Sequence, residues 1–273
     1  MSVCDPDEGM HRLLGSLLPR QVVASLPHDA ASSRELERTV AEHAHELTAI
    51  IVEPLVQAAG GMKFHSADTL ARVASLARRF DLLLILDEIA TGFGRTGTLF
   101  ACEQAGVVPD IVTLSKALTG GTLPLAATVA NKRVYEAFLA DDESRALMHG
   151  PTFSGNPLAC AAANASLDLF ATEPRLAQVA AIEAQLKSEL EPCRSLPEVR
   201  DVRVKGAIGV VQLHRSPAPE PLRARFVQKG AWIRPFGDVV YLMPPLVIAA
   251  EDLTRLTSAL RDGLREAAAA GGL

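Results

Sequence analysis

The 273-residue chain is predicted to begin with an α/β domain and to end with a smaller α+β domain. Three observations support this fold class. Residues 48–86 show a strand pattern, a helix pattern and a second strand pattern in succession. The second strand, at 82–86, is a continuous apolar run, which is typical of a strand covered on both faces. Near residue 171 the pattern changes to strands that follow one another directly.

The first elements form a strand, a helix and a strand. The segment at 48–55 reads as a strand that Pro54 ends. The segment at 66–80 predicts an amphipathic helix with Ser66 as its N-cap, and its apolar positions follow helical spacing: Leu70, Val73, Ala74 and Ala77. With the strand at 82–86, this order predicts a βαβ unit with parallel pairing.

The remaining elements follow in two groups. The first domain is expected to continue with strands at 111–114 and 125–130 and a helix rich in small residues at 156–170. The second group comprises a helix at 174–190, antiparallel strands at 199–206 and 207–214, and a helix near 219–229. Two short strands around a turn are expected within 231–245, then a final helix with Leu253, Leu256, Leu260 and Leu264 on one face. We therefore expect two domains, 1–171 and 172–273.

Composition excludes several classes of function. The chain is 48% hydrophobic and 22% charged, as expected for a soluble globular protein with a buried core. A net charge of −5 without a basic run argues against nucleic acid or an anionic membrane as the main partner. No apolar stretch reaches the ~20 residues needed to span a bilayer, and the start lacks a secretory pattern. A cytoplasmic protein is expected.

The cysteines and histidines do not indicate a metal site. Cys4, Cys102, Cys160 and Cys193 show no C-x-x-C spacing, which favours reduced thiols over a disulfide frame or a zinc site. The histidines contain no H-x-x-x-H pair. We therefore expect no metal.

Charged residues follow three of the predicted strands. Glu53, Asp87 and Lys116 each stand where an apolar run ends, and Gly120 and Gly121 come shortly after the lysine. In open α/β sheets, ligands bind at the carboxyl ends of the parallel strands. Each residue alone could serve as a turn cap or point into solvent, but two acids and one amine together indicate a site. The glycines would let backbone approach a ligand closely.

One cofactor requires this combination of side chains. Pyridoxal 5′-phosphate forms a Schiff base with a lysine, and a carboxylate beside its pyridine nitrogen keeps that nitrogen protonated. The lysine must lose its proton to attack a carbonyl, which desolvation and nearby cations favour. Lys116 and Asp87 match these two roles.

The segment GFGRTG offers a competing interpretation. Gly92, Gly94 and Gly97 match the dinucleotide-binding pattern G-x-G-x-x-G, and Asp110 follows. That fold places the glycines directly between a strand and a long helix, whereas DEIAT intervenes here and the segment before Pro109 is short. A nicotinamide-dependent oxidoreductase is therefore the remote alternative.

Several longer motifs resemble those of a known family. The segments IIVEP, LILDEIATGFGRTGTLFACE, PDIVTLSKALTGGTLP, HGPTFSGNPLACAAANASL and WIRPFGDVVYLMPP, with the opening SVCDP, are similar to the class III (fold type I) pyridoxal-phosphate aminotransferases. Ala90, two residues after the DE pair, resembles the branch that serves biotin biosynthesis, where many other members have glutamine. The resemblance implies a fold type I large domain with a mostly parallel sheet, followed by a small C-terminal domain.

The resemblance also implies roles for individual residues. Lys116 would bind the cofactor covalently and contact substrate, and Asp87 would hold the pyridinium nitrogen. Pro151 and Thr152 would bind the cofactor phosphate of the neighbouring subunit, so that a homodimer shares its active sites. The substrate would contact Gly150, Arg234 and Tyr241, with Arg234 holding its carboxylate. A structural role for Glu53 and a role beside the cofactor remain open alternatives.

The implied reaction is a ping-pong transfer in two halves. S-adenosylmethionine would donate its amino group, and 8-amino-7-oxononanoate would accept it to give 7,8-diaminononanoate.

Members of this family extend further at the N-terminus, where a glycine-serine loop and a stacking aromatic residue hold the cofactor. We therefore expect this chain to be a C-terminal portion, produced by a late-assigned start codon, a split gene or a deletion. Weak or no turnover is expected of the chain alone. An inactive remnant and a subunit completed by a separate N-terminal half remain alternatives.

Overall fold

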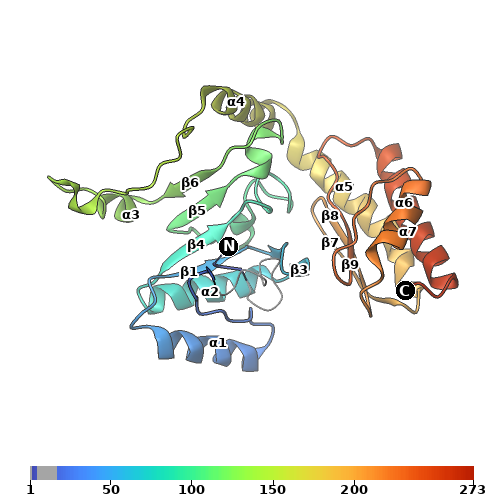
Figure 1. Ribbon diagram of the computed structural model, residues 1–273, viewed down its shortest axis with the longest axis horizontal. Coiled ribbons are helices and arrows are strands. Elements are labelled where there is room, and N and C mark those ends of the chain that lie inside the picture. The colour runs from blue at the N-terminus through green and yellow to red at the C-terminus, as the bar shows by residue number, and fades with distance from the viewer. Residues whose placement is uncertain (1, 5–16) are drawn as a thin grey trace. The chain divides into compact units, whose positions relative to one another are not determined.

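The computed structural model describes residues 2–4 and 17–273, which form two compact units (Figure 1). The first unit comprises Met1–Phe93 and Phe100–Glu173, and the second comprises Gly94–Leu99 and Pro174–Leu273. The change of unit after Glu173 lies close to the boundary expected at residue 171. Assigning the two units as a cofactor domain and a small domain remains a prediction.

The first unit is built on a four-stranded sheet. Its strands are β1 (Ala49–Val52), β4 (Leu83–Asp87), β5 (Ile111–Leu114) and β6 (Ala127–Ala130). They lie in the order β1-β4-β5-β6, with β1, β4 and β5 parallel and β6 antiparallel to β5. The prediction of a mostly parallel sheet is therefore confirmed.

The other elements of this unit surround or extend from the sheet (Figure 1). The helices are α1 (Ala30–His43), α2 (Ala67–Arg79), α3 (Lys132–Glu136) and α4 (Pro157–Thr172). A small hairpin of β2 (Val56–Gln57) and β3 (Lys63–Phe64) was not predicted, and short 3₁₀ helices span Ala101–Ala105, Lys116–Thr119 and Glu143–Arg145.

Helix α2 forms where its sequence pattern places it. The Ser66 hydroxyl accepts a hydrogen bond from Thr69 N and so caps the first turn. Every apolar position predicted to face the core is buried: Leu70, Val73, Ala74 and Ala77. These side chains share a hydrophobic cluster with Leu84 and Leu86 of β4. The helix thereby packs against the sheet.

The second unit is an antiparallel sheet with three helices. The strands β7 (Val199–Lys205), β8 (Ile208–Leu213) and β9 (Val239–Leu242) pair in that order, and the helices are α5 (Arg175–Leu190), α6 (Pro219–Gln228) and α7 (Ala250–Ala269). A short 3₁₀ helix spans Glu191–Ser195. The core joins side chains from all three helices and the sheet, among them Leu186, Leu190, Phe226, Leu253, Leu260 and Leu264.

One predicted strand is wrong. Residues 231–235 form no strand, and only an isolated bridge links Phe236 to Val239 ahead of β9. Pro235 explains the difference, because it has no backbone N–H to donate to a sheet and its φ angle is fixed. The expected strand at 125–130 is also shorter, since it begins at Ala127.

Candidate active site

Glu53, Asp87 and Lys116 lie at the carboxyl ends of three adjacent parallel strands, β1, β4 and β5. Asp87 is the last residue of β4, Glu53 directly follows β1, and Lys116 lies two residues beyond β5. The charges of Asp87 and Lys116 both act on the pKa of Glu53, so both groups lie within electrostatic range of it. The predicted strand-end cluster therefore forms.

Lys116 occupies a strained backbone position. It is exposed, begins the 3₁₀ helix Lys116–Thr119 and has a φ of +29°, which is uncommon for a residue with a side chain. Such strain costs about 1–3 kcal/mol and clusters at functional sites. The loop is held in place by bonds on either side of the lysine: Ser115 Oγ donates to Leu125 O (2.7 Å), and Ser166 Oγ donates to Ala117 O (3.2 Å).

The backbone beside the lysine leaves room for a ligand. Gly120 and Gly121 have φ angles of +61° and +80°, and a Cβ built on either glycine would meet no atom within 4 Å. Thr113, which pairs with Asp87 in the sheet register, has a buried hydroxyl without a hydrogen-bond partner in the described part of the chain. An amine, a carboxylate, a spare hydroxyl and open backbone fit the needs of pyridoxal 5′-phosphate.

The loop that follows Asp87 is held by the next residue, Glu88. The Asp87 carboxylate accepts a hydrogen bond from Ile89 N (3.0 Å), while Glu88 is 0% exposed. Glu88 accepts three bonds, from Thr91 Oγ1 (2.7 Å), Ala101 N (3.0 Å) and Cys102 N (2.9 Å). These bonds compensate the buried charge and fix the loop after β4. No role was predicted for Glu88, which stands out in the sequence only through its place beside Asp87 in the DE pair.

The Cys102 thiol is unsuited to nucleophilic chemistry. Burial, followed by the negative charge of Glu88, raises the pKa of Cys102 to about 12. A protonated thiol is a poor nucleophile, and Cys102 instead packs against the hydrophobic cluster that α2 shares with β4.

Glu53 combines a loop contact with an unusual environment. Its Oε1 accepts a hydrogen bond from Ala58 N (3.1 Å), and its backbone carbonyl contacts Nε2 of His65 (2.9 Å). Burial is the main reason that the pKa of Glu53 rises to about 7. Glu53 therefore orients the loop after β1 and also lies beside the strand-end charges, so both roles considered for it have structural support.

Gly150, Pro151 and Thr152 lie in the exposed segment that leads into α4. The backbone bonds of this segment are local, for example from Ser154 N to Pro151 O (2.9 Å). The contact of these residues with a neighbouring subunit remains a prediction.

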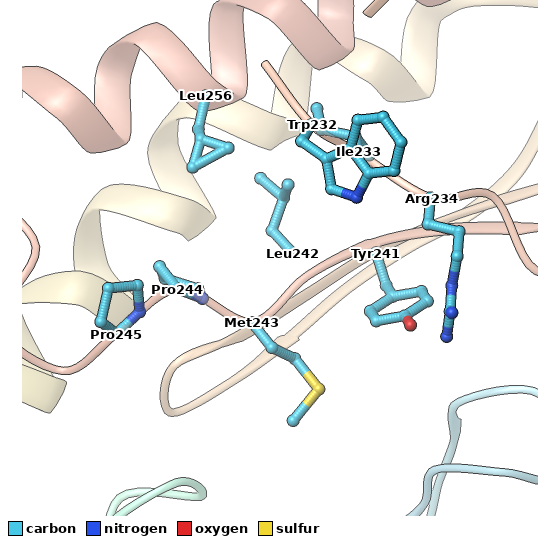
Figure 2. A pocket seen from close by; sticks show the side chains of 9 residues that line it. All are labelled: Trp232, Ile233, Arg234, Tyr241, Leu242, Met243, Pro244, Pro245 and Leu256. Carbon is cyan, nitrogen blue, oxygen red and sulfur yellow. The ribbon is translucent and has the colours of Figure 1, made fainter. Parts of the chain in front are cut away.

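Arg234 and Tyr241 belong to the second unit and line one pocket of about 390 Å³ (Figure 2). The other lining residues are mostly apolar: Trp232, Ile233, Leu242, Met243, Pro244, Pro245 and Leu256. Trp232 is 74% exposed, and the Arg223 guanidinium lies 5.8 Å from its ring centre. An apolar pocket with one guanidinium and one phenol suits an apolar molecule that ends in a carboxylate. Trp232 and Met243 were missed as lining residues, although both stand in the quoted motif.

The GFGRTG segment shapes a loop, of which Gly94 to Gly97 belong to the second unit, and does not form a dinucleotide site. It follows β4 by several residues and leads to the short 3₁₀ helix Ala101–Ala105, so no long helix begins at the glycines. Arg95 donates to Pro244 O (2.7 Å) and Ala207 O (3.2 Å), and Ala207 N donates back to Arg95 O (2.9 Å). Burial lowers the pKa of Arg95 to about 10. The nicotinamide alternative is not favoured.

The contact of this loop with Gly206 predicts a large effect on stability. Gly206 has a φ of +53°, and a Cβ on it would lie 2.4 Å from Arg95 O and 2.6 Å from Thr96 C. We expect Gly206→Ala to lower the free energy of unfolding of the second unit by about 2–4 kcal/mol, through strain and a backbone clash. Urea unfolding followed by the emission of Trp232, the single tryptophan, measures this loss.

Gly230→Ala is the matched control. Gly230 has a φ of +79° but no atom within 4 Å of a built Cβ, so this variant carries the strain without the clash. Equal losses in the two variants would contradict the proposed packing of Gly206 against the loop.

The described residues contain no group of three or more His, Cys, Asp or Glu side chains placed to hold a metal ion. In the same part of the chain, no helix has both the length and the apolar character that crossing a membrane requires.

Comparison with known proteins gives consistent matches. A family model described as "Aminotransferase class-III" matches residues 1–264. An adenosylmethionine-8-amino-7-oxononanoate aminotransferase of Mycobacterium leprae is 47% identical, over 95% of this chain and 60% of that protein. The protein of that name from Corynebacterium glutamicum is 44% identical, over 97% of this chain and 64% of its own length. The chain thus spans less than two thirds of these curated relatives.

Solved structures agree. The structure of an adenosylmethionine-8-amino-7-oxononanoate aminotransferase from Methanocaldococcus jannaschii has a TM-score of 0.88 and 33% identity, over 94% of this chain and 62% of that one. A PLP-bound amine transaminase from an uncultivated Pseudomonas species has a TM-score of 0.81 and 35% identity, over 87% of this chain and 56% of that one.

Proposed function

The chain belongs to the class-III aminotransferase family, and from this premise we propose that it acts in the amino transfer from S-adenosylmethionine to 8-amino-7-oxononanoate in biotin biosynthesis. The observation that carries the proposal is the placement of Lys116, Asp87 and Glu53 at the ends of three adjacent parallel strands. The names of the relatives from M. leprae and C. glutamicum supply the substrates. Activity in the cytoplasm as a homodimer is part of this proposal.

Pyridoxal 5′-phosphate is the proposed cofactor. When bound, it supplies an electron sink for the charge that develops at the substrate carbon. The Lys116 amine would hold the cofactor through its aldehyde carbon, with loss of water, and would move a proton at the reacting substrate carbon. The Asp87 carboxylate would keep the ring nitrogen protonated. Pro151 and Thr152 would hold the cofactor phosphate of the neighbouring subunit in the proposed dimer.

The pocket of the second unit is the proposed site for the substrate carboxylate. Arg234 presents a planar guanidinium that can form two parallel hydrogen bonds to a carboxylate. The apolar lining suits the methylene chain of 8-amino-7-oxononanoate. Tyr241 lines the same pocket, and Gly150 contributes to substrate binding as the family resemblance implies.

Substrate binding can be tested without turnover. Since the single tryptophan, Trp232, lines the pocket, we expect 8-amino-7-oxononanoate to change its emission. Arg234→Ala should weaken this binding by about 10- to 100-fold, the loss expected for a charge-assisted bond worth about 1.5–3 kcal/mol. Titration of the wild-type and variant chains with the substrate measures the change.

Two controls make this test specific. Arg194→Ala removes another guanidinium of the same unit, which bonds to Val202 O and Asp201 away from the pocket, and should leave the affinity unchanged. The same ketone without its carboxylate should bind wild type and Arg234→Ala equally. If Arg234→Ala still bound the substrate more tightly than the ketone without a carboxylate, the assignment of Arg234 as the carboxylate-binding residue would be rejected.

A further inference from the structure

Two acidic residues, Glu53 and Asp87, lie at the carboxyl ends of two neighbouring strands. Strands β1 and β4 pair in parallel with Val52 opposite Leu86, so the next residues, Glu53 and Asp87, come at the same level. Neighbouring strands are about 4.8 Å apart, and residues at one level point to the same face. Glu53 directly follows β1, and Pro54 after it disfavours a helical backbone at Glu53. The register therefore places two acids next to each other.

We propose that Glu53 holds a proton at neutral pH and so places no second negative charge beside Asp87. Two neighbouring carboxylates that both carry their charge repel each other, and a proton on Glu53 removes this repulsion. The pair then carries one negative charge. The importance of this charge for catalysis rests on the proposed function, in which Asp87 must be anionic to pair with the protonated ring nitrogen.

The surroundings of Glu53 favour its protonated form. Burial raises its pKa most, the Ala58 N–H that bonds to Oε1 lowers it, the charge of Asp87 raises it and the charge of Lys116 lowers it. His65 also lies close, but its ring contacts the backbone carbonyl of Glu53 and not its carboxylate. Burial and the charge of Asp87 thus both raise the pKa of Glu53 and disfavour a second negative charge.

Glu53 acts through Asp87 and is therefore a positioning residue for the charge of the site. A neutral Glu53 still accepts the bond from Ala58 N through its carbonyl oxygen, so the loop after β1 keeps its shape in either protonation state. Protonation of Glu53 sets the local charge without moving the backbone. A purely structural role of Glu53 would not depend on pH, whereas the proposed role does.

The direct test is a titration of the cofactor-free chain with ¹³C-labelled glutamate carboxyl groups, followed by NMR. Wild type should show one glutamate carboxyl with a midpoint at pH about 7, and this signal should be absent from Glu53→Gln. Asp87→Asn removes the neighbouring charge and should lower the midpoint by ~1 pH unit. Lys116→Ala should raise the midpoint, which provides a second test if Asp87→Asn does not fold.

Glu103→Gln is the matched control. Glu103 is exposed and accepts a hydrogen bond from Phe100 N (2.9 Å), so it caps a loop as Glu53 does but lies outside the acid pair. Its replacement should leave the titration midpoint of the Glu53 signal unchanged. A wild-type spectrum without a glutamate that titrates near neutrality, or a midpoint unmoved by Asp87→Asn, would overturn the proposal.

A second readout follows from linkage. Because the pKa of Glu53 rises from 4.5 to about 7 on folding, the folded chain binds more protons between these values. The stability that this group contributes is complete below pH 4.5 and is lost as the pH rises through about 7. Glu53→Gln should remove this loss, and parallel profiles of stability against pH in the two proteins would overturn the inference. Neither measurement uses cofactor, so failure of the chain to bind it would reject the proposed function alone.

Discussion

Lys116→Ala is expected to abolish covalent attachment of pyridoxal 5′-phosphate to the chain. Lys116 is the lysine of the strand-end cluster that it forms with Glu53 and Asp87, so loss of this side chain removes the proposed nucleophile for the cofactor aldehyde. Mixing wild type with the cofactor should produce the absorbance of a lysine-bound cofactor, and the variant should produce only that of the free cofactor. Amino transfer should disappear with it.

Lys132→Ala controls for adventitious reaction at surface lysines. Lys132 is exposed at the start of α3, where it pairs with Glu136 (3.4 Å), and its loss should leave the absorbance intact. An unchanged lysine-bound signal in Lys116→Ala would exclude Lys116 as the anchor and with it the assignment of this site.

The Asp87→Asn variant should still bind the cofactor covalently but should carry out amino transfer much more slowly. The amide keeps the size of the side chain and can still accept the bond from Ile89 N, but it carries no charge to hold a proton on the ring nitrogen. We expect the first half-reaction with the amino donor to slow by about 10²–10³-fold, the range typical of losing one positioned electrostatic partner of the reacting group. Cofactor affinity should fall about 10- to 100-fold.

Stopped-flow absorbance measures the rate of the half-reaction, and a cofactor titration measures the affinity for the cofactor. Asp81→Asn is the control, because Asp81 is an exposed carboxylate of the same unit, paired with Arg133 (3.1 Å), and asparagine tolerates its φ of +53°. A rate in Asp87→Asn equal to that of the control would show that Asp87 does not serve the ring nitrogen.

Local patterns predicted the elements that position the site. Helix α2 follows from Ser66 and the spacing of its apolar residues, and β5 begins and ends at the predicted residues, Ile111 and Leu114. Each pattern reflects a contact between residues near in sequence or a repeat of burial along one element. The strand-end cluster could be predicted because parallel strands align their carboxyl ends. Three separate sequence positions therefore meet at one edge of the sheet, and this prediction needs no knowledge of side-chain contacts.

Long-range contacts account for what the sequence did not reveal. The roles of Glu88 and Glu53 depend on backbone donors and burial that are supplied only after folding. Residues 94–99 belong to the second unit because Arg95 bonds to carbonyls more than a hundred positions away, which no local pattern encodes. The first of the two short strands expected within 231–245 does not form, and Pro235 lacks the backbone N–H that a sheet needs there.

A crystal structure of the chain with pyridoxal 5′-phosphate tests the central claim most directly. The account predicts that the cofactor aldehyde carbon is bonded to Nζ of Lys116 and that the ring nitrogen lies within hydrogen-bond distance of the Asp87 carboxylate. A cofactor attached to another lysine, or a ring nitrogen that faces a group other than Asp87, would contradict it.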